Sequence, residues 1–146
     1  MRHDENYVDP NREQFEQFKN LDRNQPILML NMLRFRAEAD YPTDHPRASD
    51  ALTGEQAYAH YGEESGPIFQ RQGGEIVWRG NFQTTLIGPA DESWDTVFIA
   101  RYPTAHAFLG MITDPDYQQA VVNRQAAVAT SRLIRLSEAT LGTGFG

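Results

Sequence analysis

A tyrosine and an arginine stand in a helical pattern that is otherwise typical of a protein core. In the segment DPDYQQAVVNRQAAV (114–128), four residues are spaced by four, three and four positions and share one face of a predicted helix: Tyr117, Val121, Arg124 and Val128. An arginine fork on that face could hold a carboxylate or enolate oxygen of a small molecule. It could equally pair with an acidic neighbour while its methylene groups cover the core. The pattern leaves both interpretations open.

Three further residues could bring polar groups to the same pocket. Asn31 is the only polar residue on its face of a predicted strand, and an unpaired amide in an apolar layer costs about 1–3 kcal/mol, so we expect a backbone group or a bound molecule as its partner. Tyr58 and Tyr61 lie on the inward face of a predicted helix, although buried tyrosines commonly satisfy their hydroxyls locally. The candidate ligand-binding residues are therefore Asn31, Tyr58, Tyr61, Tyr117 and Arg124.

The sequence offers few groups for acid–base or metal chemistry. His106, close to the start of a predicted helix, is a candidate general base. His60 and Glu64 have the spacing of a metal-ligand pair, but no third ligand accompanies them, so we expect no metal. The chain has no cysteine, which excludes thiolate nucleophiles, disulfides and Cys-ligated metals. Because no histidine stands at an inward helix position for haem and no glycine-rich phosphate loop occurs, we expect no cofactor.

Length and charge limit the classes of partner. The 146 residues fit one domain. A formal net charge of -7 disfavours nucleic acids and anionic membranes, because both are bound by clustered lysine and arginine. No apolar run approaches the ~18 residues of a membrane span, and the first residues lack the apolar stretch of a signal peptide, so we expect a cytoplasmic protein. Small molecules and other proteins, including a second copy, remain as partners.

Two parts are expected along the chain. Residues 1–25 form a predicted helical extension with Asp9 as its N-cap, and residues 26–146 form a single predicted domain. The first strand of that domain, PILMLNMLRFR (26–36), carries apolar side chains on both faces. A strand of this kind is typically covered on both faces. If one face were solvated, polar and apolar residues would alternate along the strand.

The middle of the domain predicts a loop, a helix and a hairpin. Residues 37–52 are polar and interrupted by prolines, which favours a long loop. A capping box formed by Thr53 and Gln56 begins a helix. The segments EIVWRGNFQTTLIG and WDTVFIARY then form a predicted hairpin with a connection of four to six residues, with Gly80 as a candidate bulge.

A helical segment, capped a second time at Asp114 and running to about Ala129, and a final strand SRLIRLS complete the domain. The order strand, helix, strand, strand, helix, strand is that of the ferredoxin-like βαββαβ fold, in the α+β class with an antiparallel sheet. Such a fold covers one face of its sheet with helices and leaves the other bare. Because the first strand is apolar on both faces, we expect a second copy to pack sheet to sheet in a homodimer.

The chain also resembles a known family over about residues 26–137. Its most specific features are a Tyr-Pro after the third strand, a hydrophobic helix, Asp-Pro-Asp-Tyr, an arginine seven residues after that tyrosine, and a closing Ser-Arg-Leu-Ile. On these features the chain is similar to the bacterial family of unknown function numbered 1330, a branch of the dimeric α+β barrel superfamily. The matching positions include Tyr117 and Arg124. The N-terminal helix and the long loop at 37–52 depart from the family pattern.

The resemblance implies the dimeric α+β barrel but no activity, since the wider superfamily includes cofactor-free monooxygenases, lactone isomerases and haem enzymes. Our first hypothesis is a homodimer with a small-molecule pocket between helices and sheet. The alternative is a cofactor-independent enzyme, monooxygenase- or isomerase-like, acting on a small acidic or aromatic compound; Arg124 and Asn31 would hold an oxyanion, and His106 or a tyrosine would move the proton. A third hypothesis is a structural dimer without a ligand.

Overall fold

The computed structural model describes residues 6–146, so the first five residues of the predicted N-terminal extension lie outside it. The elements in chain order are α1 (Arg12–Asn20), β1 (Ile27–Phe35), α2 (Gly54–Arg71), β2 (Glu75–Gly80), β3 (Thr96–Tyr102), α3 (Ala105–Ile112), α4 (Pro115–Ala127) and β4 (Val128–Leu136). Apart from α1, this order is the predicted βαββαβ pattern, with its second helix divided into α3 and α4.

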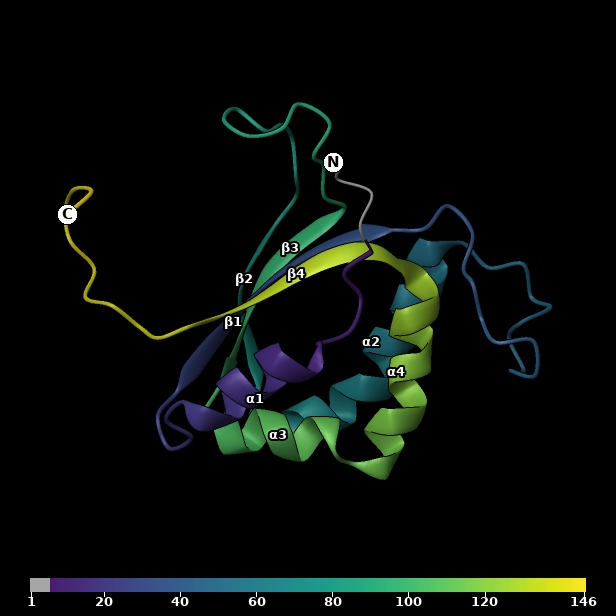
Figure 1. Ribbon diagram of the computed structural model, residues 1–146, viewed down its shortest axis with the longest axis horizontal. Helices are drawn as coiled ribbons and strands as arrows, with labels where there is room; N and C mark the ends of the chain where they lie inside the picture. Colours follow the sequence, from purple (N-terminus) through teal and green to yellow (C-terminus); the bar gives the residue numbers. More distant parts are fainter. Residues whose placement is uncertain (1–5) are drawn as a thin grey trace.

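The four strands form one antiparallel sheet in the order β2-β3-β1-β4, with β1 paired to both β3 and β4. All four helices lie on the same side of this sheet (Figure 1). The chain therefore has the ferredoxin-like α+β fold that the sequence predicts. No helix within residues 6–146 combines the length and the apolar character that a bilayer crossing requires.

Local capping explains where the helices begin. Thr53 and Gln56 form the predicted capping box at the start of α2, and Asp114 caps α4 with Pro115 in the first turn. The predicted helix α1 is present, but its predicted N-cap, Asp9, was wrong: the N-cap is Asn11, whose Oδ1 accepts from the Gln14 N–H at 2.7 Å. The carboxylate of Asp9 instead accepts a hydrogen bond from the Gln125 side chain at 3.2 Å.

The predicted hairpin differs from the structure in both length and geometry. β2 ends at Gly80, and the connection to β3 is the 15-residue segment 81–95 rather than a turn of four to six residues. The apolar pair Leu86 and Ile87 is more than 90% exposed in this segment, so the TTLI pattern has no partner strand. The irregularity in the pairing of β2 with β3 falls between Ile76 and Trp78, whereas Gly80, the predicted bulge, pairs with Val97.

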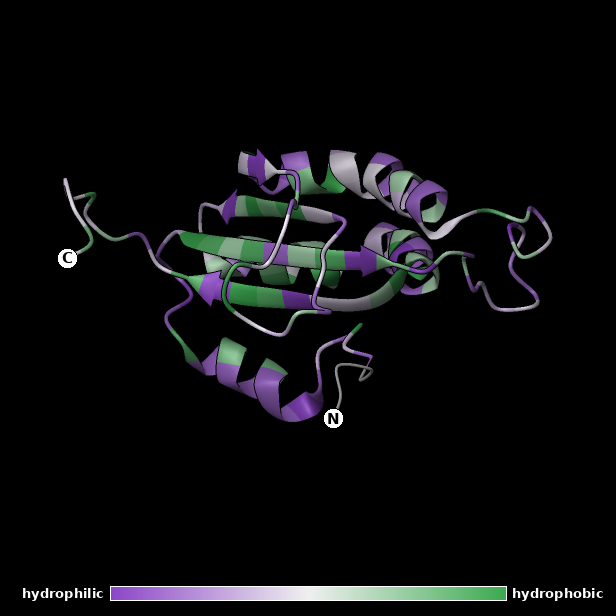
Figure 2. Ribbon diagram, turned by 90° about the horizontal axis from the view of Figure 1, so that it is seen from above, coloured by the Kyte–Doolittle hydropathy of each residue, from purple (hydrophilic) through white to green (hydrophobic). Residues whose placement is uncertain are grey.

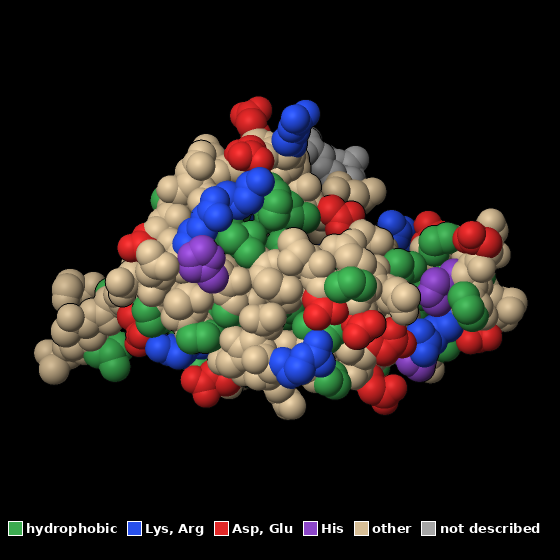
Figure 3. Space-filling view, turned by 90° about the horizontal axis from the view of Figure 1, so that it is seen from below, with side chains coloured by type: hydrophobic (Ala, Val, Ile, Leu, Met, Phe, Trp, Pro, Cys, Tyr) green, Lys and Arg blue, Asp and Glu red, His purple; other side chains and the backbone are tan. Residues whose placement is uncertain are grey.

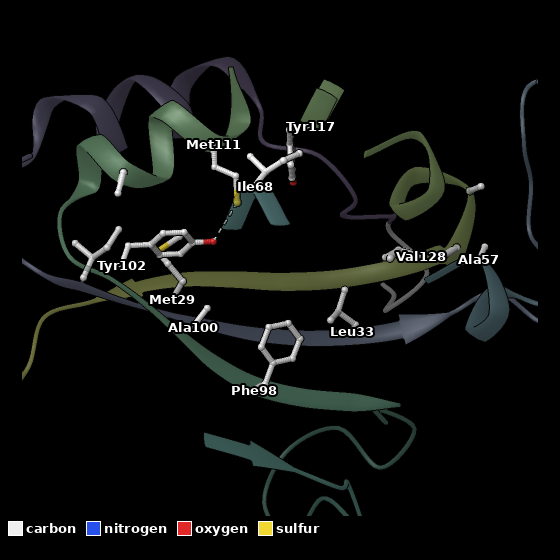
Figure 4. Packing of buried hydrophobic residues seen from close by; sticks show 14 of the residues in the cluster. Met29, Leu33, Ala57, Ile68, Phe98, Ala100, Tyr102, Met111, Tyr117 and Val128 are labelled. Carbon is white, nitrogen blue, oxygen red and sulfur yellow. Dashed lines mark hydrogen bonds between the residues drawn. The ribbon is translucent and has the colours of Figure 1, made fainter. Parts of the chain in front are cut away.

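The core lies between the helices and one face of the sheet. Figure 4 shows side chains of this cluster meeting from both layers, with the Tyr102 hydroxyl directed at the Met111 sulfur at 3.9 Å. The strands supply mainly Ile27, Met29, Leu33, Phe98, Ala100 and Tyr102, and the helices supply Ala57, Ile68, Met111 and Tyr117 among others. Burial of this apolar area is the main source of stability for the fold.

The opposite face of the sheet carries no helix in the described part of the chain (Figure 1). Leu28, Leu30 and Met32 of β1 point to this open face, alternating with the buried residues of the same strand. Leu30 pairs with Ile134 of β4, which is 42% exposed. Seen from above, the central strands are coloured mostly hydrophobic, whereas α1 is mostly hydrophilic (Figure 2). β1 is thus apolar on both faces, but this chain covers only one of them.

Candidate functional site

A large cleft lies between the helix face of the sheet and the helices. Its volume is about 1640 Å³, and it is open to solvent. All four helices contribute to its walls, together with residues from every strand of the sheet. The cleft is lined by all five residues that the sequence singled out for ligand binding: Asn31, Tyr58, Tyr61, Tyr117 and Arg124.

The charged side chains of the cleft are mostly cationic. Acidic and basic side chains are interspersed over the outer helix side of the molecule (Figure 3). Among the described residues that line the cleft, only Asp9 and Glu75 carry carboxylates, whereas five are arginines: Arg12, Arg79, Arg124, Arg132 and Arg135. A chain with a net charge of -7 therefore concentrates positive charge around this cavity, which favours an anionic ligand.

Three aromatic hydroxyls gather where α2 faces α4. The hydroxyls of Tyr61 and Tyr117 are 2.8 Å apart, and the ring of Tyr58 packs against that of Tyr61 with centroids 5.3 Å apart. Burial raises the pKa of Tyr58 and of Tyr117 far above the ordinary value of 10, and the nearby Arg124 charge opposes this only in part. Both side chains are neutral at physiological pH. Because one hydroxyl of the Tyr61–Tyr117 pair donates to the other, the second O–H is available to a ligand.

Asn31 has a backbone partner, which is one of the two kinds of partner that the sequence left open. Its Nδ2 donates to the carbonyl of Met29 at 3.1 Å. Its Oδ1 accepts no hydrogen bond from the described residues, and the side chain lines the cleft. The amide oxygen is therefore an acceptor that remains open to a donor on a ligand.

Arg124 is held by neutral acceptors. Its Nη1 donates to the Val8 carbonyl at 2.5 Å and its Nη2 to the Ser131 Oγ at 3.3 Å. The ion pairs among residues 6–146 are Lys19–Glu16, Arg47–Glu64, Arg71–Asp114 and Arg101–Glu138, so no described carboxylate neutralises Arg124. The pairing with an acidic neighbour that the sequence left open is thus not observed in this part of the chain.

The histidine candidates lie away from the cleft. His106 is exposed on α3 and is not among the lining residues, so the structure does not bring it together with the five ligand-binding candidates. Glu64, the partner considered for His60, instead accepts from Arg47 at 2.8 Å. No cluster of three metal-ligating side chains occurs within residues 6–146.

A buried polar network next to the site was missed from the sequence. Asn123 is 0% exposed on α4, and its Oδ1 accepts from the Tyr41 hydroxyl at 2.6 Å and from Arg47 at 3.1 Å. Its Nδ2 donates to Glu64 and to the Ala120 carbonyl, each at 3.1 Å. The small residues at 120 and 127 mark the buried face of this helix and could have revealed Asn123. The network fastens the 37–52 loop to α2 and α4.

We expect Asn123→Ala to loosen this loop. The substitution leaves the buried Tyr41 hydroxyl without its acceptor and takes a partner from Arg47 and from Glu64, which should cost about 2–3 kcal/mol of unfolding free energy. Limited trypsin digestion should cut after Arg47 faster than in the wild type. The exposed Gln119→Ala variant on the same helix serves as a control. Cleavage at an unchanged rate would show that the network does not hold the loop.

Alkaline titration should separate the buried tyrosines from the rest. Burial raises the pKa of four of the six tyrosines, namely Tyr41, Tyr58, Tyr102 and Tyr117. The folded chain keeps protons that the unfolded chain releases above about pH 10, so the contribution of these tyrosines to stability should be constant below that pH and fall above it. We expect the ultraviolet absorbance of the Tyr58, Tyr102 and Tyr117 tyrosinates to appear only with the loss of circular dichroism. Ionisation of all six in the folded protein would contradict the assigned burial.

Comparisons with known proteins place the chain in a family. The model described as "Domain of unknown function (DUF1330)" matches residues 48–136. The crystal structure of RPA0582, a protein of unknown function from Rhodopseudomonas palustris, is 52% identical with a TM-score of 0.86, covering 94% of this chain and 100% of that one. Methylated RPA0582 is 51% identical with a TM-score of 0.88, covering 94% and 98%.

More distant matches add nothing about function. SnoaB, a cofactor-independent oxygenase from Streptomyces nogalater, shares 18% identity over 82% of this chain and 99% of that one, with a TM-score of 0.48. No match was found among curated proteins. The family match and the likeness to RPA0582 agree with the resemblance noted in the sequence, and the chain belongs to the DUF1330 family of domains of unknown function.

Proposed function

We propose that this protein is a homodimer that binds a small acidic or aromatic compound, best a compound that is both, in the cleft between helices and sheet. The observation that carries the proposal is the excess of arginine over carboxylate in the cleft wall, with Arg124 bound only to neutral acceptors among the described residues. A planar guanidinium is suited to a carboxylate, to which it can donate two parallel hydrogen bonds.

The other walls of the cleft suit an aromatic ring. Phe69, Phe98 and Phe108 line it together with the tyrosines. Aromatic side chains favour edge-to-face or offset contact with a ring. The neutral tyrosine hydroxyls can donate hydrogen bonds, and the Asn31 Oδ1 can accept one, so a ligand with a hydroxyl group would find both partners. The volume of about 1640 Å³ exceeds the roughly 300–1,000 Å³ of common small-molecule sites, so a small acid would fill only part of it.

The homodimer is supported by the open face of the sheet. Strands β1, β3 and β4 present apolar side chains there, and the partly exposed Ile134 and Leu136 continue the surface to the sheet edge. A contiguous apolar surface of this kind is commonly an interface. A second copy packing sheet to sheet would cover the face of β1 that one chain leaves bare.

The catalytic alternative has less support than binding. A proton-transfer enzyme needs a group at the cavity whose pKa lies near the working pH. Tyr58 and Tyr117 are held neutral by burial, and His106 lies outside the cleft. Binding or sensing of a ligand is therefore the function that the geometry favours.

A thermal-shift experiment tests the proposal. The wild type, Arg124→Ala and the exposed control Gln119→Ala are melted with benzoate, 4-hydroxybenzoate or the neutral analogue benzamide. At concentrations about 100-fold above Kd, a ligand of the folded state adds about 2.7 kcal/mol and should raise Tm by roughly 5–10 °C. We expect shifts with the acids for wild type and control, and much smaller ones with benzamide or with Arg124→Ala.

Other outcomes of the thermal-shift experiment would contradict the proposal. If no acid shifts the wild type, or if benzamide shifts Tm as much as benzoate does, the cleft does not select a carboxylate. A lower Tm of unliganded Arg124→Ala combined with absent shifts in the wild type would identify Arg124 as a structural residue that only fastens the N-terminal segment.

A further inference from the structure

The segment before α1 runs along the outer edge of β4 and forms an N-terminal strap, defined here as residues 7–9. The Tyr7 N–H donates to the Thr130 Oγ1 at 3.3 Å, and the Ser131 hydroxyl donates to the Tyr7 carbonyl at 2.8 Å. All three residues of the strap are among those that line the cleft. The strap therefore closes one side of the cavity where β4 leaves its edge unpaired by another strand.

The strap also accepts a hydrogen bond from Arg124, the arginine of the proposed site. Arg124 donates through Nη1 to the Val8 carbonyl at 2.5 Å, and its Nη2 donates to Ser131, which itself donates to the strap. A guanidinium has five N–H donors, and these two bonds are the only ones that Arg124 makes with described residues. A carbonyl offers one neutral oxygen, whereas a carboxylate offers two charged ones and forms stronger hydrogen bonds with arginine. The strap carbonyl is thus a weaker partner than an acid would be.

The side-chain contacts between the strap and the rest of the chain are weak and exposed to solvent. Gln125 donates to the Asp9 carboxylate at 3.2 Å on the exposed face of α4, and the guanidinium of Arg132 lies 4.8 Å from the centre of the Tyr7 ring. Tyr7 is 50% exposed. Exposed hydrogen bonds and cation–π contacts contribute little each, because water competes for the same groups.

From this arrangement we infer that the N-terminal strap occupies the carboxylate subsite in the unliganded protein and is displaced when a small acid binds to Arg124 and Ser131. The inference rests on the proposed function and adds to it the position of the acid group and a role for the N-terminal extension. The ligand carboxylate replaces the Val8 carbonyl on Nη1. Since the binding-competent state is then only a fraction of the unliganded protein, the strap lowers the observed affinity by that fraction.

The test compares a strap variant with the wild type in isothermal titration with benzoate. The double variant Tyr7→Ala/Gln125→Ala removes the ring on Arg132 and the donor to Asp9, and it leaves every charge in place. Both positions are exposed, so we expect the fold to persist. We expect a Kd for benzoate about tenfold lower than that of the wild type, because loss of roughly 1.4 kcal/mol of strap contacts is a tenfold change. Gln119→Ala should match the wild type.

Each outcome decides between the two proposals. Tighter binding in the double variant, or binding in the double variant alone, supports both the strap and the acid site. Equal Kd values in wild type and double variant overturn the strap while leaving the proposed function intact. Binding by neither protein overturns both. As an independent readout, saturating benzoate should speed hydrogen exchange of the Val8 and Asp9 amides in the wild type, and unchanged exchange with bound benzoate would again overturn the strap.

Discussion

Gly54→Ala should destabilise the protein by about 3 kcal/mol and lower its Tm by about 10 °C, because the backbone leaves no room for a methyl group. A Cβ on Gly54 would lie 2.2 Å from the Arg36 carbonyl oxygen and 2.8 Å from that of Ala127. The Gly54 N–H donates to the Arg36 carbonyl, and the Arg36 N–H donates to the Ala127 carbonyl. The end of β1, the start of α2 and the end of α4 therefore meet through backbone atoms, which cannot turn aside as a side chain can.

The same helix contains the matched control. Gly62 also lies within α2, but a Cβ there would meet no atom within 4 Å. Gly62→Ala should raise stability by roughly 0.5–1 kcal/mol, since alanine is the better helix former. Urea unfolding at one fixed protein concentration measures both variants. Equal effects of the two substitutions, or a neutral Gly54→Ala, would show that the three elements do not meet as closely as described.

Ile134→Asp should convert the proposed homodimer into monomers. Ile134 lies on the open sheet face beside Leu30, on the edge strand of the surface that a second copy would cover. A carboxylate in a dry interface loses its hydration without gaining a partner, which costs several kcal/mol. Light scattering should give the wild type twice the 16.6 kDa of one chain and the variant a single chain mass at the same protein concentration.

The neighbouring residue provides the control. Leu133 is 43% exposed, about as much as Ile134 at 42%, but it pairs with Asn31, so its side chain points to the helix face of the sheet rather than to the open face. Leu133→Asp introduces the same charge one residue away and should leave the dimer mass unchanged. A monomeric wild type would contradict the homodimer, and loss of the dimer in both variants would mean that a general disturbance of β4 is responsible.

The fold was predictable because its signals are local. The capping box at Thr53 and the cap at Asp114 mark helix starts through the chemistry of single turns. The run of apolar side chains in 26–36 marks a strand, and the structure has β1 there, with helices on one of its two apolar faces. Local reasoning fails where two residues can cap one helix: both Asp9 and Asn11 could cap α1, Asn11 does so, and Asp9 instead accepts from Gln125, which is distant in sequence.

The sequence indicated which residues would line the cleft, but not the contacts that they make. Helical spacing placed Tyr117 and Arg124 on one inward face, and both line the cleft. The partner of Arg124 lies 116 residues away in the strap, and no spacing rule connects the two segments. The buried network around Asn123 likewise joins residues far apart in the chain, so only the folded structure shows that a polar residue on a small-residue face has partners there. The apolar TTLI segment was misread because β2 and β3 pair over a shorter length than its pattern indicates.

The most direct test of the account is a crystal structure of the wild-type protein grown with benzoate. We expect the ligand in the cleft, with its carboxylate within hydrogen-bond distance of the Arg124 guanidinium and its ring among the aromatic side chains of the walls. Density for benzoate elsewhere, or a cleft without ligand at concentrations that saturate the protein in solution, would contradict the assignment of this cavity as the binding site.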